Sequence, residues 1–305
     1  MDKLSAMKAF VKVVESGTFT KAADALGVPK AQISRLVQSL EQELKTLLLN
    51  RTTRRVVTTP DGAAYYERAV RVLDDIEELE SDMSTAKTHP RGKLRIDVSP
   101  PVANHIVIPS IADFCASFPD IQVDIGVSER PVDLVGESVD CAIRAGALSD
   151  PSLVARRLGD VRRVLCASPA YLRRCGAPQH PSELNDEPHR VIRYFTYGGG
   201  RLSYLLERDG EQCEIYPGST IAVNESSAMM AAGLAGLGIA RSNMIVVAPY
   251  LESGRLRLVL PEWNAGAIPL YVVYPPNRHV SAKLRVFIDW VADVCSKAIE
   301  GQAHR

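Results

Sequence analysis

The stretch "AADALGVPKAQISR", positions 22–35, holds two short helical patterns apart with Gly27, Val28 and Pro29. Glycine reaches backbone angles that are costly for other residues, and proline suits the first turn of a helix but not its interior. The stretch therefore predicts a helix, a tight turn and a second helix. Such a corner restricts the start of the chain to a small unit in which helices cross at an angle.

The spacing of apolar residues predicts three helices before position 45. Apolar residues from Leu4 to Val14 recur at helical intervals, and Gly17 ends this first helix. Thr18 or Thr20 can accept a hydrogen bond from an exposed backbone amide and so begin the second helix. The third helix is expected to bury one side and expose the other. Its inner side carries Ile33, Val37, Leu40 and Leu44, and its outer side carries Lys30, Gln32, Ser34, Arg35 and Gln38.

A helix-turn-helix of this kind places its last helix in the major groove of double-stranded DNA, with the first residues against base edges. Gln32 is expected to pair with an adenine edge, and Arg35 with a guanine edge or a phosphate. Residues 47–62 combine β-branched and basic residues in short runs and close on a Pro-Asp-Gly turn, which predicts a two-stranded wing. A solvated surface is the alternative for the basic residues of the wing. The DNA-binding candidates are Thr18, Thr20, Lys30, Gln32, Ser34, Arg35, Gln38, Arg51, Thr53, Arg54 and Arg55.

Charge is distributed unevenly along a chain of 305 residues whose formal net charge is zero. Residues 1–62 contain ten Lys and Arg against six Asp and Glu, and residues 63–87 contain three against seven. Only the first block suits a polyanion. We therefore expect residues 1–62 to form the DNA-binding domain, and the acidic segment that follows to stay away from phosphate.

Residues 63–88 predict one long linker helix that pairs with a second copy of the chain. Its apolar residues repeat at intervals of four and three, which is typical of a coiled coil. The predicted dimer seam consists of Tyr65, Ala69, Val72, Ile76, Leu79 and Met83. A helix packed on its own domain is the alternative. A dimer would hold two DNA-reading helices about 34 Å apart, or a multiple of that distance, to read a palindrome.

Beyond a hinge predicted at "HPRGK", residues 89–93, strands alternate with helical stretches. This pattern favours a mostly parallel sheet flanked by helices. The first series has strands at 94–98, 121–127 and 140–144, with helices near 105–117 and 131–137. After a strand at 161–167, the second series has strands near 191–197 and 219–223, a helix over 226–235 and a strand over 238–247. A strand at 269–275 and a last helix from Ser281 resume the first pattern.

We expect an effector-binding domain over 94–305, made of two α/β subdomains joined by two crossing strands. The first subdomain would comprise 94–162 and 269–305, and the second 163–268. Ligands in such folds bind where strand ends face a cleft. The cleft candidates are Ser99, Pro100, Pro101, Val102, Ser128, Glu129, Arg144, Ala145, Gly146, Thr196, Tyr197, Asn224, Glu225, Ser226 and Arg241.

Among these candidates, Ser99, Ser128 and Thr196 are the preferred ligand contacts, although each residue taken alone is also explained as a loop or cap residue. Amides at the start of the helix at 226 are expected to hold a carboxylate of the ligand. Met229 and Met230 are expected in the core rather than in the pocket.

Several function classes lack their motifs in this sequence. There is no G-x-S-x-G, P-loop, dinucleotide fingerprint or pair of metal ligands, so we expect neither an enzyme nor a cofactor or metal. The six cysteines form no C-x-x-C pair, which favours buried reduced thiols over a redox sensor. No apolar run approaches the roughly 20 residues of a membrane helix, and the first residues do not resemble a signal peptide. We therefore expect a cytoplasmic protein without a membrane partner, and not an exported solute-binding protein.

Residues 1–87, with "AADALGVPKAQISRLVQSLE", "NRTTRR" and "TPDG", resemble the LysR-type transcriptional regulators, and residues 129–172 resemble the effector domain of the same family. The chain departs from the family where residues 29–32 replace the usual Ser-Gln-Pro-Ala. It also has Lys45 where a glycine is usual, which predicts a longer end to the third helix.

The resemblance implies a fold class of a helical, winged helix-turn-helix domain, a linker helix and two Rossmann-like α/β subdomains, similar to type II periplasmic binding proteins. It implies a bacterial regulator of transcription that binds promoter DNA and a small effector, often an organic acid or an aromatic metabolite. Partners implied by the family are a second copy of the chain in a dimer, two dimers in a tetramer, and RNA polymerase.

Overall fold

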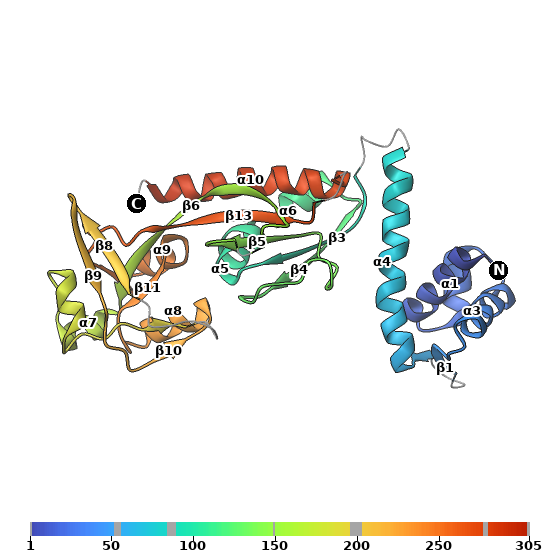
Figure 1. Ribbon diagram of the computed structural model, residues 1–305, viewed down its shortest axis with the longest axis horizontal. Helices are drawn as coiled ribbons and strands as arrows, with labels where there is room; N and C mark the ends of the chain where they lie inside the picture. The colour runs from blue at the N-terminus through green and yellow to red at the C-terminus, as the bar shows by residue number, and fades with distance from the viewer. Residues whose placement is uncertain are drawn as a thin grey trace. The chain divides into compact units, whose positions relative to one another are not determined.

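The computed structural model describes residues 2–51, 56–83, 90–148, 150–195, 203–276 and 280–303 (Figure 1). It divides into two compact units, Met1–His89 and Pro90–Arg305, which we describe separately. The predicted contacts Thr53, Arg54, Arg55, Thr196 and Tyr197 lie outside the described residues.

The first unit is built around three short helices, as the spacing of its apolar residues predicts. These are α1 (Lys3–Ser16), α2 (Phe19–Leu26) and α3 (Lys30–Leu44). Gly27 takes φ 66°, the left-handed conformation that the corner between α2 and α3 requires. Of the two candidate threonines, Thr18 begins α2, because its hydroxyl accepts the Lys21 amide at 3.2 Å. On α3, Ile33, Val37 and Leu40 are completely buried.

The end of α3 differs from the prediction of a longer helix. The helix stops at Leu44, and Lys45 takes the left-handed conformation with φ 53°, so that its amide bonds back to Gln42 O and Glu41 O. The expected extension fails because this C-terminal cap forms even without the usual glycine. Glu41 fixes the chain that follows, since its buried carboxylate accepts the amides of Leu48 at 2.9 Å and Leu49 at 3.1 Å.

The wing consists of two antiparallel strands, and the long helix follows it directly. The strands are β1 (Leu49–Arg51) and β2 (Val56–Thr58), and the helix is α4 (Pro60–Met83). The Pro-Asp-Gly segment is therefore not a turn, which corrects the prediction. Thr59 caps the helix by accepting the Gly62 amide at 2.9 Å, and Pro60 suits the first helical position. A Cβ atom at Gly62 would lie 1.9 Å from Leu48 O, so glycine permits this close approach.

The second unit is organised by one mixed sheet in the order β11-β6-β13-β5-β3-β4, with β12 also paired to β6. Two strands, β6 (Val154–Ala167) and β13 (Ala267–Tyr274), pair antiparallel along most of their length. Past Arg162, β6 continues into the second subdomain and pairs with β11 (Ala240–Asn243). The ladder between β6 and β13 shifts by one residue between Leu270 and Tyr271. These are the two crossing strands that the sequence predicts.

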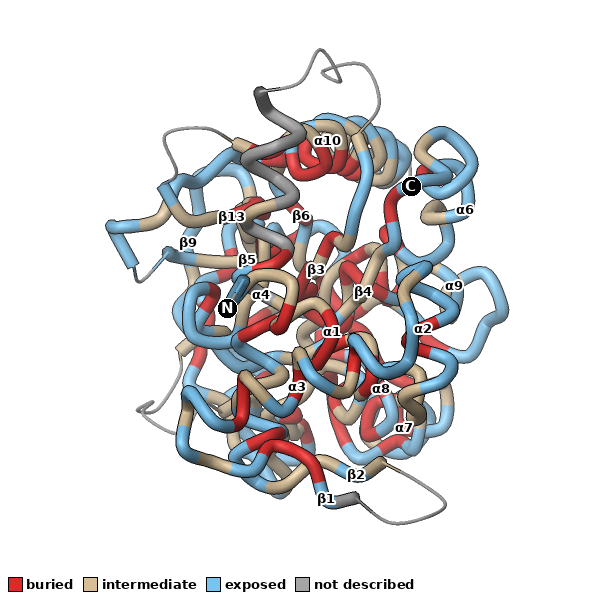
Figure 2. Tube along the Cα trace, turned by 90° about the vertical axis from the view of Figure 1, so that its right-hand side faces the viewer, coloured by how far each residue is buried: buried red, intermediate tan, exposed pale blue. Residues whose placement is uncertain are grey.

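The first subdomain has a parallel set of strands covered by helices. The strands are β3 (Gly92–Val98), β4 (Ile121–Val127) and β5 (Cys141–Ala145). The helices are α5 (Pro100–Val102), the π-helical turn η1 (Ala103–Val107), α6 (Ile108–Ser117) and α10 (Ala282–Ala303). Buried residues of α10, red in Figure 2, pack with the sheet in one apolar core. Gly92 and Lys93 belong to β3, although the hinge was predicted to include them.

A helix predicted at 131–137 is absent from the described structure at that place. Residues 134–138 form a turn, in which Asp133 Oδ1 accepts the Gly136 amide at 2.8 Å. Ser138 ends the turn with φ 55°. An aspartate that bonds its own neighbouring backbone competes with helix formation, which explains the difference.

The second subdomain carries short helices around the continuation of β6. Its helices are α7 (Pro169–Cys175), the 3-10 turn η2 (Pro181–Asn185), α8 (Ser226–Leu234) and α9 (Met244–Glu252). Its remaining strands are β7 (Arg193–Tyr194), β8 (Tyr204–Arg208), β9 (Glu211–Ile215), β10 (Ala222–Val223) and β12 (Arg257–Val259).

The strand predictions for this subdomain need two corrections. The strand expected over 238–247 stops at Asn243, and the apolar residues after it begin α9. A short apolar run fits a buried helix as well as a strand, so the spacing of its apolar residues does not distinguish the two. The β8–β9 hairpin was not predicted.

The cysteines are free thiols, and three of them match the prediction of burial. Cys141, Cys166 and Cys295 are buried, and burial raises the pKa of Cys166 and Cys295 to about 12. Cys115 is exposed, contrary to the prediction. Within the described ranges, no helix combines the length and apolar character needed to cross a membrane.

Candidate DNA-binding face and ligand cleft

The outer side of α3 is polar and lies open to solvent. Lys30, Gln32, Arg35 and Gln38 are exposed and Ser34 is half-buried, whereas the inner residues form the core of the unit. Within the described ranges, the exposed four have no side-chain hydrogen bond or ion pair. They are therefore free to contact bases and phosphates if α3 lies in a DNA groove.

The other predicted DNA contacts within the described residues are Thr18, Thr20 and Arg51. Thr20 is exposed, while the hydroxyl of Thr18 is engaged in capping α2. Arg51 lies at the end of β1, opposite Val56, at the start of the predicted wing loop.

The predicted seam on α4 divides into two parts. Ala69 is buried, and Tyr65 packs edge-on against Phe10 with ring centroids 5.6 Å apart, so both belong to the core of their own unit. This corrects the seam for its first two positions, because α4 begins by running beside α1. Val72 is 44% exposed and Ile76 is half-buried, which leaves an apolar edge further along α4. The side chains of Leu79 and Met83 lie outside the described residues.

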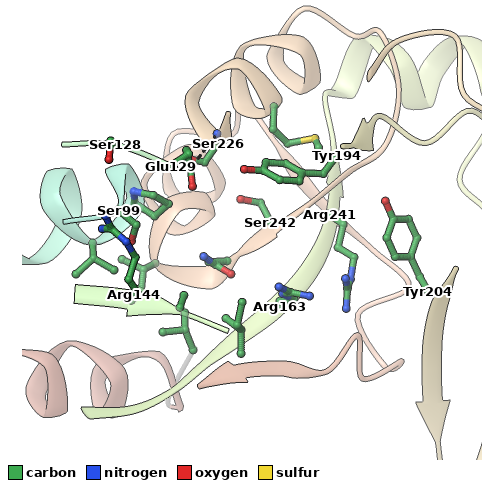
Figure 3. A pocket seen from close by; sticks show the side chains of 18 of the residues that line it. Ser99, Ser128, Glu129, Arg144, Arg163, Tyr194, Tyr204, Ser226, Arg241 and Ser242 are labelled. Carbon is green, nitrogen blue, oxygen red and sulfur yellow. Dashed lines mark hydrogen bonds between the residues drawn. The ribbon is translucent and has the colours of Figure 1, made fainter. Parts of the chain in front are cut away.

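A cavity of about 640 Å³ lies between the two subdomains (Figure 3). Nine predicted residues line it: Ser99, Pro101, Val102, Ser128, Glu129, Arg144, Ala145, Ser226 and Arg241. Ten others were missed: Val161, Arg163, Tyr194, Ser203, Tyr204, Met229, Ser242, Asn243, Ile245 and Ile268. Met229 is buried in the core and lines the cavity as well, while Met230 lines a neighbouring cavity of about 220 Å³.

Four predicted cleft residues have other places. Pro100 faces the smaller neighbouring cavity. Gly146 is held by its amide, which donates to Pro269 O at 2.8 Å. The carbonyl of Asn224 accepts the Tyr194 hydroxyl at 3.0 Å, and Glu225 caps α8. None of the four lines the larger cavity.

On the cavity wall that the first subdomain provides, the charge of Arg144 is compensated by a carboxylate of the same subdomain. Asp97 is buried at the end of β3 and forms an ion pair with Arg144 from β5. The Ser128 hydroxyl also donates to Asp97 Oδ1 at 3.1 Å, and Arg144 Nη2 donates to Arg130 O at 3.2 Å. Asp97 is not among the predicted site residues, although an acidic residue inside an apolar strand is a signal for a buried partner.

The start of α8 is occupied by the chain's own carboxylates. Glu225 accepts the amides of Ser227 at 2.7 Å and Ala228 at 2.9 Å. Glu129, from the first subdomain, accepts the Ser226 amide at 3.2 Å. The expectation that these amides hold a carboxylate of the ligand is therefore wrong. Burial opposes ionisation of Glu225, but the hydrogen bonds from Ser227 and Ala228 outweigh it and lower its pKa.

The wall that the second subdomain provides carries two neighbouring arginines. Arg241 Nη2 donates to Ala265 O at 2.7 Å, and its guanidinium carbon lies 4.9 Å from the centre of the Tyr204 ring. Burial and the charge of Arg163 lower the pKa of Arg241 to about 10, and burial also lowers the pKa of Arg163. Arg241 Nε is buried with no hydrogen-bond partner among the described residues, and the same holds for Ser99 Oγ across the cavity.

Chemically, this cleft suits reversible binding of a small molecule. Its volume lies in the range of small-molecule sites, roughly 300 to 1,000 Å³, and it combines apolar walls with a few polar groups. In the described ranges, no three His, Cys, Asp or Glu side chains are grouped so that they could hold a metal ion.

Two family models match the chain, one on each unit. "Bacterial regulatory helix-turn-helix protein, lysR family" matches residues 4–63, and "LysR substrate binding domain" matches residues 87–296. The chain is similar to the HTH-type transcriptional regulator YhjC of Escherichia coli (strain K12), with 40% identity over 301 residues, which cover 98% of this chain and all (100%) of the relative.

Two further relatives agree. An HTH-type transcriptional repressor of Pseudomonas aeruginosa (strain UCBPP-PA14) is 39% identical over 304 residues, covering 99% of this chain and 95% of the relative. The solved structure of CrgA, a LysR-type transcriptional regulator from Neisseria meningitidis, is 32% identical with a TM-score of 0.61, and the match covers 95% of this chain and 98% of that chain.

Proposed function

The chain belongs to the LysR family of bacterial regulators, and from this we propose how it reads DNA and which molecules control it. It is a DNA-binding transcriptional regulator with an effector-binding domain, and its relatives are regulators of transcription rather than enzymes. Modulation by an effector is typical of the family.

The polar side of α3 reads the promoter. Gln32 pairs with an adenine edge, Arg35 with a guanine edge or a phosphate, and Lys30, Ser34 and Gln38 supply neighbouring contacts. The observation that supports this proposal most is that Lys30, Gln32, Arg35 and Gln38 are exposed and, among the described residues, without ion pairs. On the inner face of the same helix Ile33, Val37 and Leu40 are buried. The wing residues Arg51, Thr53, Arg54 and Arg55 give affinity by contacting the DNA backbone.

The effector is a small organic acid or aromatic metabolite that binds in the cavity between the subdomains. Both subdomains line this cavity, with apolar, aromatic and cationic side chains. A ligand shifts the protein between two arrangements only if it binds one of them more tightly. A molecule that contacts both walls meets this condition, because its contacts depend on how close the walls stand.

Paired α4 helices set the spacing of the two DNA-reading units in a dimer, and dimers associate into a tetramer. Val72 and Ile76 provide the apolar edge of α4 for this pairing. The effector changes how the subunits pack, and so alters DNA bending and contact with RNA polymerase in the cytoplasm.

An Arg35→Ala variant of the full chain tests the reading of DNA. Genomic fragments captured by the purified protein first supply the target, including the region upstream of its own gene. We expect Arg35→Ala to weaken specific binding by about 1 to 3 kcal/mol with little effect on random DNA. Equal losses on both DNAs would assign Arg35 to phosphate. Lys3→Ala, which removes a charge paired with Glu43 at 2.9 Å, is the control.

Effector control is tested on the same DNA target. A footprint is followed while organic acids and aromatic metabolites are titrated to saturation. A change of the footprint supports the coupling, and an unchanged footprint with a ligand known to be bound contradicts it.

A further inference from the structure

The charged groups that line the cavity differ in how they are compensated. Arg144 is paired with Asp97, and Glu129 accepts the Ser226 amide. For Arg163 and Arg241, the described residues provide no carboxylate within ion-pair distance. Two positive charges on the second subdomain therefore face the cavity without a counter-charge from this part of the chain.

The sheet brings these two arginines together. In the ladder between β6 and β11, Arg241 lies opposite Leu165, and Asn243 lies opposite Arg163. Residues two apart on a strand share a face, so Arg163 and Arg241 are diagonal neighbours within reach of each other. Figure 3 shows the two arginine side chains near each other among the residues that line the cavity, and burial, together with the nearby charge of Arg163, lowers the pKa of Arg241.

Arg241 is held in place while part of its hydrogen-bonding capacity is unused. Ala265 O and the Tyr204 ring fix its guanidinium, but Nε is buried and without a partner among the described residues. Burying a donor without an acceptor is unfavourable, and so is holding two cations side by side. One ligand oxyanion would relieve both, because a planar carboxylate can accept from two guanidinium groups.

The surroundings describe the rest of the ligand. Val161, Met229, Ile245 and Ile268 give the cavity apolar walls. Ser99, on the opposite side of the cavity in Figure 3, is 7% exposed, and its hydroxyl lacks a partner in the described part of the chain. The cavity thus has an uncompensated cationic end and apolar walls, and at its other end Ser99 carries a hydroxyl without a described partner beside polar groups that are already engaged.

We propose that Arg163 and Arg241 form an anion-binding subsite that holds the carboxylate of a small organic acid, with the apolar body of the acid between the walls and a polar substituent toward Ser99. This inference rests on the proposed function of the cavity as the effector site. It moves the carboxylate away from the start of α8, where Glu225 and Glu129 already hold the amides.

The test uses the full chain and a matched pair of probes, benzoate and its uncharged analogue benzamide. Thermal denaturation followed by circular dichroism and titration calorimetry measure binding, in a buffer without other oxyanions. Benzoate should raise the midpoint and benzamide should not. Arg163→Met and Arg241→Met, made separately, should each weaken benzoate binding at least tenfold. Arg257→Met, an exposed arginine of β12, should bind as the wild type does.

Each other outcome has a meaning. Benzoate binding that survives in both methionine variants overturns the subsite but leaves the cavity as an effector site. The subsite is also overturned if the wild type does not respond to benzoate, malonate or inorganic phosphate at about 50 mM. That concentration is well above the Kd of weak binding, which is on the order of 1 mM. The circular dichroism spectrum and binding to the captured DNA target show whether a variant is folded. A footprint that no bound ligand alters would instead contradict the proposed effector control.

Discussion

The two walls of the cleft use the same residue type in opposite ways. On the first subdomain, Arg144 is tied to Asp97, and Ser128 is tied to the same carboxylate. On the second subdomain, Arg163 and Arg241 stand together without a described counter-charge. We interpret the compensated arginine as part of the fold and propose the uncompensated pair as a binding site. The partners of a charged side chain, more than its place in a pocket, thus indicate its role.

The largest effect should follow from breaking the compensated wall. Asp97→Asn leaves the guanidinium of Arg144, whose side chain is 18% exposed, without its counter-charge. We expect the free energy of unfolding to fall by about 3 kcal/mol, as when one partner of a buried pair is removed. Urea denaturation followed by circular dichroism measures it.

The control for this variant is Asp124→Asn on the neighbouring strand. Asp124 pairs with Lys93 at 2.6 Å, but its side chain is 45% exposed, so its loss should cost less than about 1 kcal/mol. Equal effects of the two variants would contradict the distinction between the walls.

A smaller effect should follow at the boundary between the walls, where Glu225 caps α8. Glu225→Ala should lower the free energy of unfolding by about 1 kcal/mol, because two amides lose their acceptor. The same measurement at two pH values sharpens the assignment. Because the pKa of Glu225 is lowered from 4.5 in the folded state, the stabilisation is complete at neutral pH.

That stabilisation is lost as the pH falls below 4.5 and through the lowered pKa of the folded protein. The difference in unfolding free energy between wild type and Glu225→Gln should therefore be larger at pH 7 than at pH 3, values set on either side of the ordinary carboxyl range of about 4. A difference that does not change with pH would show that the charge of Glu225 is unimportant for the cap.

The smallest effect on stability should come from the uncompensated wall. Arg241→Met loses one hydrogen bond and the contact with Tyr204, but it also removes the repulsion by Arg163. We expect the free energy of unfolding to change by less than about 1 kcal/mol in the absence of ligand. A loss as large as that of Asp97→Asn in the same denaturation experiment would make Arg241 a structural residue.

Local patterns predicted the first unit well, because its elements are defined by neighbouring residues. Gly27 marks the corner, and Ile33, Val37 and Leu40 are spaced so that one face of α3 is buried. Where a short segment fits two kinds of secondary structure, its local pattern did not predict which one forms. Pro60 fits both a turn and a first helical position, and the long-range contact of Gly62 with Leu48 O was invisible in the sequence.

The cleft was predictable only in part, for a related reason. Residues at strand ends, such as Ser99 and Glu129, follow from the alternation of strands and helices. Arg163 lies within a strand and reaches the cavity through its register with β11, which no local pattern encodes. Asp97, the partner of Arg144, and Glu129, which accepts the Ser226 amide, likewise come from distant parts of the chain, so no local pattern predicted these contacts.

The pairing of β13 with β6, and the continuation of β6 into the second subdomain, have a mechanical consequence. Domains joined by loops can swing apart at little elastic cost, but here any opening of the cleft must twist two hydrogen-bonded strands. We expect the deformation to concentrate where the ladder slips between Leu270 and Tyr271, because fewer regular bonds resist it there. The pair of strands would then act as a torsion spring, and its stiffness would set how strongly the protein responds to a bound molecule.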